Sequence, residues 1–388
     1  MHTTSQEGLT CFMSLYIIVG IVLLLCSWYE FSVKRTNKAL YYTLFFGLML
    51  MLCLRYGQGT DYFAYQYIYE LLPKTLNPIT LAASSSLHSE IGWKFLCAFS
   101  RILGLHFYVF VAIIGVITMY FLHLFIQKYC PLKITALFIA YPTLFLTYIY
   151  SGMRQALVIC FFLGVLLDLY LKKKHTLYFI LVLLCSLIHT SSLILLVLLL
   201  GRINSKQQDQ FIVFSWFIGV LFAVLNIRIS FLGRVFTNED SSISYIAVAE
   251  RLLTYIVIRH IYGNYKRHTN EKNEFLDTIM YIYSICMLLY GIFFSMPTVA
   301  SRTCYFFKAV EIVVITVLLN NSKKVHSDAS FLYTYIALLA LVMLYKNIDS
   351  YIMQGNYYKA YRSAWSFPYN NIFIEEIYRY SIHQRLLP

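Results

Sequence analysis

Charged side chains are scarce in this sequence. Asp, Glu, Lys and Arg together make up 13% of its 388 residues, while apolar and aromatic residues make up 60%. A soluble domain usually carries about 25% charged residues and about 45–50% apolar ones. The shortage of charge therefore argues against a water-soluble enzyme, and the excess apolar surface must face lipid.

Several catalytic and cofactor motifs are also missing. The sequence contains no G-x-x-x-x-G-K-[ST], no G-x-S-x-G and no H-E-x-x-H, which argues against P-loop, hydrolase-elbow and zincin chemistry. Its nine cysteines form no C-x-x-C pair, so they indicate neither a zinc site nor a disulfide framework. We therefore expect no cofactor and no metal site.

Positive charge exceeds negative charge, with 31 Lys and Arg against 18 Asp and Glu. These cations lie in short clusters between apolar runs, which is the pattern that fixes the orientation of membrane helices. Nucleic-acid binding requires a continuous basic patch instead, so we expect no nucleic acid as a partner. The clusters are Lys34/Arg35/Lys38, Lys128/Lys133, Lys172/Lys173/Lys174, Lys266/Arg267/Lys272 and Lys323/Lys324.

Apolar runs long enough to cross a bilayer as helices recur along the chain. The sequence therefore predicts an all-α, polytopic integral membrane protein with about 10–12 transmembrane helices. We expect residues 1–346 to form one transmembrane domain, whose first apolar run stays in the membrane as an anchor. The expected spans are residues 9–29, 39–54, 104–126, 134–150, 153–171, 211–230, 244–262, 275–295, 301–320 and 329–346.

Placing the cation clusters in the cytoplasm leaves residues 55–103 as an external loop and residues 347–388 as an external C-terminal segment with a candidate amphipathic helix. The apolar run at residues 176–200 does not fit this count, because a simple crossing would leave an odd number of spans. A re-entrant hairpin broken at residues 189–192 restores parity. Non-helical backbone at membrane depth requires surrounding protein or a water-filled cavity, which predicts a buried cavity near His189.

The external loop begins with a motif that suits carbohydrate. Asp61 supplies a carboxylate for sugar hydroxyls, and Tyr62 and Tyr65 supply rings on which sugar faces stack; the chain is rich in tyrosine, with 35 Tyr against 4 Trp. The alternative is an ordinary helix exit with an interfacial tyrosine belt. Further along the loop, Glu90 precedes a short amphipathic stretch at residues 91–103 and is an external carboxylate able to accept a proton.

Three arginines lie at the outer ends of spans, where the orientation of the chain does not require them. They are Arg55, Arg154 and Arg302. A guanidinium grips phosphate with a planar fork, so three cations at one depth predict a diphosphate site, with snorkelling of each side chain as the alternative. Gln155 follows Arg154, and Tyr305 lies one turn below Arg302.

Two further groups have less specific signals. His189 is the deepest titratable group; it lines the expected cavity or is a hydrogen-bonded structural histidine. Lys308 and Glu311 are three residues apart within a span and are expected to pair with each other.

These residues resemble the motifs of the EpsG/Wzy-like polysaccharide polymerases. The resemblance covers residues 40–370 approximately, and Thr190 and Val158 depart from the usual pattern. Its motifs are Arg55 with Gly59-Thr60-Asp61-Tyr62 and Tyr65, Glu90-Ile91-Gly92, Arg154-Gln155-Ala156, Ile188-His189-Thr190-Ser191, Arg302 with Tyr305, and Pro368-Tyr369.

The resemblance implies a multi-pass enzyme of the bacterial inner membrane that joins undecaprenyl-pyrophosphate-linked oligosaccharide repeat units on the outer face. The product is O antigen, capsule or exopolysaccharide. Expected partners are the lipid-linked oligosaccharide and membrane lipids, with a chain-length regulator and a flippase as candidates. Alternative functions are a flippase or transporter of the lipid-linked sugar, a related ligase, and a sugar acyltransferase.

Within this reading, the arginines Arg55, Arg154 and Arg302 bind the pyrophosphate. Glu90 or Asp61 is the preferred base for the attacking hydroxyl, with His189 as the next candidate. The saccharide contacts are Tyr62, Tyr65, Gln155 and Tyr305.

Overall fold

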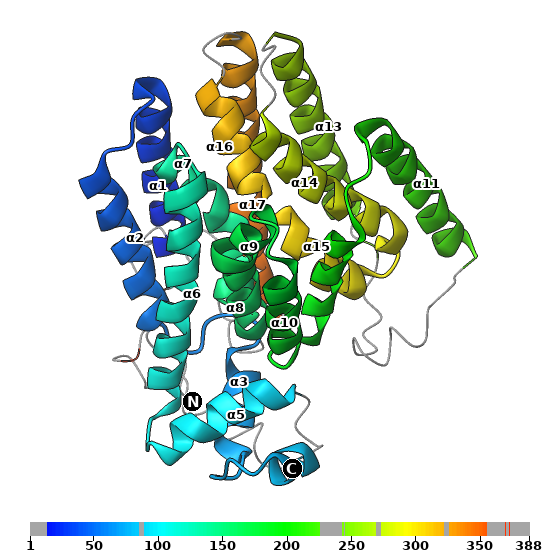
Figure 1. Cartoon of the computed structure of the whole chain (residues 1–388). Helices are drawn as coiled ribbons and strands as arrows, with labels where there is room; N and C mark the ends of the chain where they lie inside the picture. The colour runs from blue at the N-terminus through cyan, green and yellow to red at the C-terminus, as the bar shows by residue number, and fades with distance from the viewer. Residues whose placement is uncertain are drawn as a thin grey trace, which may run out of the picture.

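A computed structural model describes residues 14–84, 89–225, 243, 245–268, 273–321, 326–354, 369 and 372. All regular elements within these residues are helices, arranged as a bundle with a small helical layer at one end (Figure 1). Seven of them are long and apolar enough to cross a membrane, and four shorter apolar helices accompany them. This confirms the all-α, polytopic class.

The helices fall into three groups. The long ones are α1 (Leu15–Val33), α6 (Phe107–Tyr129), the continuous α8, η2 and α9 (Met153–Phe161, Phe162–Leu166, Leu167–Leu171), α11 (Ser205–Val224), α13 (Tyr245–His268), α14 (Glu274–Phe293), α15 with α16 (Pro297–Lys308, Glu311–Asn321) and α17 (His326–Gln354). The shorter apolar ones are α2 (Lys38–Cys53), α7 with η1 (Lys133–Ala140, Tyr141–Ile149), α10 (His175–Ser186) and η3 (Thr190–Leu200). The end layer holds α3 (Tyr62–Leu71), α4 (Pro78–Ala83) and α5 (Ile91–Ile102).

Each of the ten expected spans coincides with a helix, but several boundaries move. Helix α11 begins at Ser205, six residues before the expected start, because the Asn204 side chain caps it by accepting from the Gln207 backbone N–H at 2.8 Å. Helix α15 begins at Pro297, since proline suits the first turn, where a backbone N–H has no helical partner. Helix α17 continues to Gln354, beyond the expected domain boundary at residue 346.

A buried acid joins the first helix to the middle of the bundle. Glu30, which is 0% exposed, accepts hydrogen bonds from the backbone N–H groups of Ile134 at 3.1 Å and Thr135 at 2.7 Å. These N–H groups lie at the start of α7 and have no partner within that helix. The carboxylate therefore caps α7 and also meets the positive end of its helix dipole.

The rod of α15 and α16 forms the centre of the bundle. Most residues of the membrane-length segment Pro297–Asn321 are buried, because α7, α13, α14 and α17 pack around it. A turn at residues 309–310 separates α15 from α16. Because of this break, Lys308 and Glu311 do not form the expected pair: Lys308 Nζ contacts Glu250 Oε1 of α13 at 2.5 Å, and Glu311 accepts from the Tyr283 hydroxyl at 2.7 Å.

A helical hairpin forms at residues 176–200, but its break begins before the expected residues 189–192, of which 190–192 already belong to η3. Helix α10 packs against η3, and the chain breaks between them at residues 187–189. The 12 residues of α10 rise about 18 Å and the 11 residues of η3 about 22 Å. Both arms are shorter than the hydrocarbon core of about 30 Å, which supports a hairpin that enters and leaves on one side.

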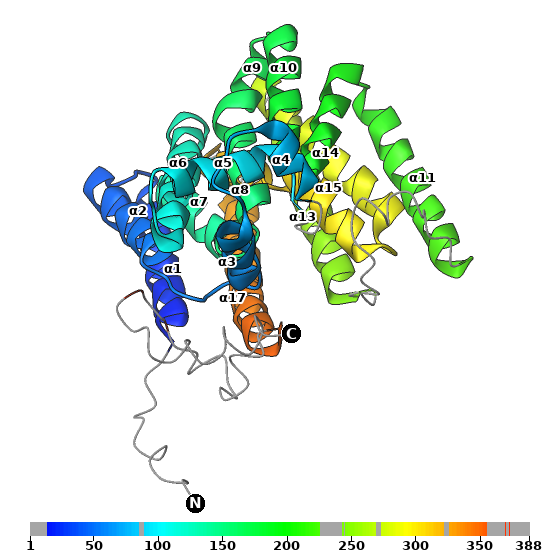
Figure 2. The same cartoon turned by 90° about the horizontal axis from the view of Figure 1, so that it is seen from below.

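The short helices of residues 55–103, the segment predicted to be an external loop, cover one end of the bundle. Seen from below, α3, α4 and α5 lie across the ends of α6, α8 and α10 (Figure 2). They form a second small core with α6, centred on Tyr62, Tyr65, Trp93 and Phe110. The loop expected at residues 55–103 is therefore a packed helical layer, and residues 85–88 within it lie outside the described part.

Candidate active site

The predicted site residues gather around one short segment, residues 149–155, which we call the hub. It connects η1 to α8 at the end of the bundle that α3–α5 cover. The external loop approaches it closely, because the Thr60 backbone N–H donates to the Ser151 hydroxyl at 3.1 Å. Gly59 has φ +103°, and a β-carbon there would collide with the Tyr150 carbonyl, so only glycine permits this approach.

A charge cluster lies beside the hub. Arg154, in the first turn of α8, forms an ion pair with Glu90, which directly precedes α5. The other carboxylate oxygen of Glu90 accepts from the Thr190 backbone N–H at 3.1 Å and lies 3.6 Å from His189 Nδ1. Three residues that are far apart in the sequence, Glu90, Arg154 and His189, are therefore brought into contact, as a shared site requires.

The ionisation of Glu90 follows from these contacts. Burial acts to raise the pKa of the carboxyl, but His189, Arg154 and the Thr190 N–H outweigh it and lower the pKa to about 2. A carboxylate with so low a pKa is a weak proton acceptor at neutral pH. Its geometry suits the positioning of Arg154 and His189 better than the role of base.

His189 is the group in this cluster with free capacity for a proton. The side chain is buried, with 8% of the residue exposed, and neither ring nitrogen forms a hydrogen bond with any described residue. The ring lies 6.4 Å from that of Phe306 on α15. The nearby Ser192 hydroxyl is likewise buried and unpartnered among the described residues.

Helix α15 brings Arg302 to the same place. Gln155 of the hub donates through its side-chain amide to the Arg302 carbonyl at 3.2 Å, and the Tyr148 hydroxyl donates to the Ser301 carbonyl at 3.3 Å. The rings of Tyr148 and Tyr305 are in contact, with centroids 3.8 Å apart and planes tilted by 32°. The positive charges of Arg154 and Arg302 both act on His189, so these two arginines converge.

Arg55 contacts the beginning of the hub, at Ile149 and Tyr150. Its guanidinium donates to the Ile149 carbonyl at 3.3 Å and lies over the Tyr150 ring at 4.5 Å. The residue is 1% exposed and is packed between α2, α6 and the hub, next to Leu52 and Ile114. In this state Arg55 orders the hub and is shielded from any ligand outside.

The tyrosines of the first loop that were expected to bind saccharide are packed inside the protein and are not exposed on its surface. Tyr62 and Tyr65 are both buried, and Arg154 lies over the Tyr65 ring at 5.6 Å. Trp93, which no sequence pattern indicated, packs against Tyr65, and the centroids of the two rings are 5.5 Å apart. Asp61 is exposed at the start of α3 and accepts from the Thr60 hydroxyl at 3.0 Å.

Two contributors to the site could not be found from the sequence. Thr190 holds Glu90 through its backbone, which no side-chain pattern reports. Tyr148 connects the hub to α15 only because two distant helices pack together. Among the described residues, no group of three or more His, Cys, Asp and Glu is placed to hold a metal ion.

Comparison with known proteins gives one family. The model of the EpsG family matches residues 38–363, which covers most of the chain and every predicted site residue. No curated protein and no solved structure matches the chain.

Proposed function

The chain belongs to the EpsG family, and we propose that it is a polysaccharide polymerase that joins lipid-diphosphate-linked oligosaccharide units. The proposed donor is an undecaprenyl-pyrophosphate-linked oligosaccharide, and the proposed product is O antigen, capsule or exopolysaccharide. The proposed location is the outer face of the bacterial inner membrane, with the chain as a multi-pass protein. A chain-length regulator and a flippase are proposed partners.

The observation that carries this proposal is the convergence of Arg154, Arg302, Glu90 and His189 at the covered end of the bundle. Two arginines lie beside a histidine whose ring nitrogens have no hydrogen-bond partner among the described residues. Glycosyl transfer from a diphosphate requires two functions that such a group of residues can supply. One is stabilisation of negative charge on the leaving group. The other is removal of a proton from the attacking hydroxyl.

In the proposed reaction, a hydroxyl oxygen of one repeat unit attacks the anomeric carbon of the other saccharide. The bond between that carbon and the diphosphate oxygen breaks, and the lipid diphosphate leaves with the electron pair. Arg154 and Arg302 stabilise the charge that develops on the diphosphate. His189 accepts the hydroxyl proton, Glu90 positions the imidazole through its Nδ1 side, and exposed Asp61 is the second candidate base.

The remaining residues support binding. We propose that Gln155 and Tyr305 hold the saccharide near α15, since both lie at the contact between the hub and that helix. Tyr62 and Tyr65 support Arg154 from below through the second core. Arg55 maintains the hub in the conformation that presents Arg154.

Deletion of the gene followed by complementation tests the proposal. Loss of a polymerase leaves acceptors that carry a single repeat unit, loss of a flippase or ligase leaves none, and loss of an acyltransferase leaves full-length chains. We expect Arg154→Ala and Arg302→Ala to leave single repeat units on a gel.

Arg101→Ala is the matched control, because Arg101 lies in the last turn of α5, in the same end layer but outside the cluster. It is expected to restore the full ladder. A normal ladder from Arg154→Ala at a normal protein level would overturn the role of the arginines.

A further inference from the structure

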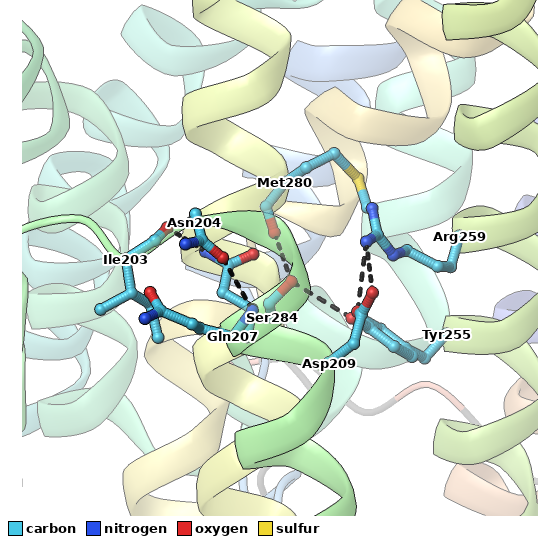
Figure 3. A network of polar contacts seen from close by, with 9 residues as sticks. Ile203, Asn204, Gln207, Asp209, Tyr255, Arg259, Met280 and Ser284 are labelled. Carbon is cyan, nitrogen blue, oxygen red and sulfur yellow. Dashed lines mark hydrogen bonds and ion pairs between the residues drawn. The ribbon is translucent and has the colours of Figure 1, made fainter.

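Two of the three arginines on helix α13 lie in very different surroundings. Arg259 donates through Nη2 to both carboxylate oxygens of Asp209 on α11, at 3.1 and 2.8 Å (Figure 3). Its charge is therefore matched by an acid of the protein itself. Arg251, two turns earlier on the same helix, has a buried Nε and a buried Nη1 that form no hydrogen bond with any described residue.

The acids nearest to Arg251 are already engaged. Glu250 contacts Lys308 Nζ at 2.5 Å, and Glu311 accepts from the Tyr283 hydroxyl at 2.7 Å. A guanidinium whose Nε and Nη1 are buried without acceptors is costly, because these two groups have lost their water without gaining hydrogen bonds. A bound anion would explain this arrangement, because its oxygens would accept the unpaired hydrogen bonds of the guanidinium.

The surroundings of Arg251 also orient its donors. The guanidinium lies over the Tyr290 ring of α14 at 4.1 Å, which holds one face and leaves the N–H edge available. A guanidinium held in this way presents a planar fork that matches two oxygens of a phosphate or carboxylate. A lysine in this position would supply charge without the fork.

This site adjoins the one already described. The charge of Arg251 acts on Tyr148, whose hydroxyl donates to the Ser301 carbonyl one residue before Arg302. Arg251 therefore lies within electrostatic range of Tyr148, which precedes the hub and contacts Tyr305 of α15.

We infer that Arg251 is a further substrate-binding residue and that it takes an oxyanion of the substrate. This inference rests on the proposed function. The oxyanion is a phosphate of a lipid-linked diphosphate or the carboxylate of an acidic sugar, which present the same pair of oxygens to the fork.

Binding to the purified full-length protein in detergent micelles tests the inference. Every variant carries Arg154→Gln, so that the cation beside Glu90 does not dominate the signal. The probes are farnesyl diphosphate, inorganic pyrophosphate and glucuronate, and the readouts are the dissociation constant of each probe and the melting temperature without a probe. The variants are Arg251→Gln, Arg251→Lys and the matched control Arg259→Gln.

We expect Arg251→Gln to weaken binding at least tenfold, Arg251→Lys to weaken it less, and Arg259→Gln to leave it unchanged. The melting temperature of Arg251→Gln without a probe should not fall, because the substitution removes a buried cation without acceptors. If Arg251→Gln weakens the binding of the two diphosphate probes, the oxyanion is a phosphate of the lipid diphosphate. If it weakens the binding of glucuronate, the oxyanion is the carboxylate of an acidic sugar.

Equal affinity of the parent and Arg251→Gln for all three probes would overturn the inference and leave Arg251 as a structural partner of Tyr290. Absence of binding by the parent would overturn it as well. Both readouts are independent of polymer formation, so a failure of the proposed function appears separately, in the gel ladder.

Discussion

At the scale of single residues, the cluster beside the hub contains an ion pair, Glu90 with Arg154, and the imidazole of His189. Glu90 is held by Arg154 and by the Thr190 backbone, whereas the ring nitrogens of His189 have no hydrogen-bond partner among the described residues. A carboxylate with this many donors stays ionised, whereas burial lowers the pKa of the His189 imidazole, which is therefore neutral and able to accept a proton at neutral pH. The histidine is therefore the better proton acceptor, although the sequence favoured the acids.

The charge pair can be tested by exchanging its members. Glu90→Gln leaves Arg154 without its partner, so we expect a loss of about 2 kcal/mol in the free energy of unfolding. The double variant Glu90→Arg/Arg154→Glu should recover part of this stability, because the two charges still attract each other. It should not recover polymer formation, since the cation then lies on the wrong side of the site.

Thermal melting and the gel ladder measure the two effects separately. Full polymer length from the exchanged pair would show that the position of the cation does not matter, contrary to the proposed stabilisation of the leaving diphosphate.

The pH dependence separates Glu90 from His189. With its pKa lowered to about 2, Glu90 stabilises the fold at neutral pH and loses this contribution only as the pH falls below the usual range of carboxyl groups toward 2. Its charge is constant between about pH 5 and pH 9. We therefore expect an acid limb of the rate profile to come from His189, with the rate rising as the imidazole loses its proton.

His189→Gln should lower the rate and abolish that limb, while Glu90→Gln should lower the rate and retain it. The measurement is the rate of polymer formation against pH in membranes that contain each variant. An unchanged limb in His189→Gln would assign the base to another group, with Asp61 as the next candidate.

At the scale of elements, the site depends on how closely α5 approaches the hairpin of α10 and η3. The Gly92 backbone N–H donates to the Leu187 carbonyl at 2.8 Å, and this contact places Glu90 next to Thr190. The absence of a side chain at Gly92 is what permits it, because a β-carbon there would lie 2.7 Å from the Leu187 carbonyl oxygen. Two π-helical segments, η1 and η2, flank α8, which carries Arg154, and such segments are frequent near functional sites.

Gly92→Ala tests this contact. We expect it to push α5 away from the hairpin, to lower the free energy of unfolding by about 1–3 kcal/mol, and to shorten the polymer because Glu90 moves with α5. Gly47→Ala is the matched control: Gly47 also lies within a helix but has open space around it, so alanine should be neutral or slightly stabilising. Equal melting temperatures for the two variants would show that α5 adapts without cost.

At the scale of the whole molecule, the far end of the chain returns to the first loop. The Tyr369 hydroxyl donates to the Met51 carbonyl at 2.9 Å, and the Ile372 backbone N–H donates to the Leu54 carbonyl at 3.0 Å. These carbonyls belong to the end of α2, where helical partners are lacking. The contacts therefore stabilise the chain just before Arg55 and close the bundle around the hub.

Tyr369→Phe removes one of these hydrogen bonds while it retains the ring, so we expect a loss of about 1 kcal/mol in stability and weaker polymerisation. Tyr120→Phe is the control, because Tyr120 is 56% exposed on α6 and distant in sequence from the site. Thermal melting of the purified variants measures the loss. If both variants melt like the parent, the return of the chain end does not stabilise α2.

The sequence alone was sufficient for the membrane class, for a helix at each of the ten expected spans and for a helical hairpin at residues 176–200. These features depend on local hydrophobicity and on cation clusters, both of which can be read directly from the sequence. It was also sufficient to select Arg154, Arg302 and Glu90, because charges that neither topology nor solubility requires stand out in a chain with so few.

Only the tertiary structure decided how these residues act. Packing of α5, α8, α10 and α15 made Glu90 the partner of Arg154, left the His189 nitrogens without a described partner, buried Arg55, and joined Lys308 to Glu250 instead of Glu311. Ion pairs and burial depend on which helices meet and at what depth. That depends on long-range packing, which no local pattern in the sequence records.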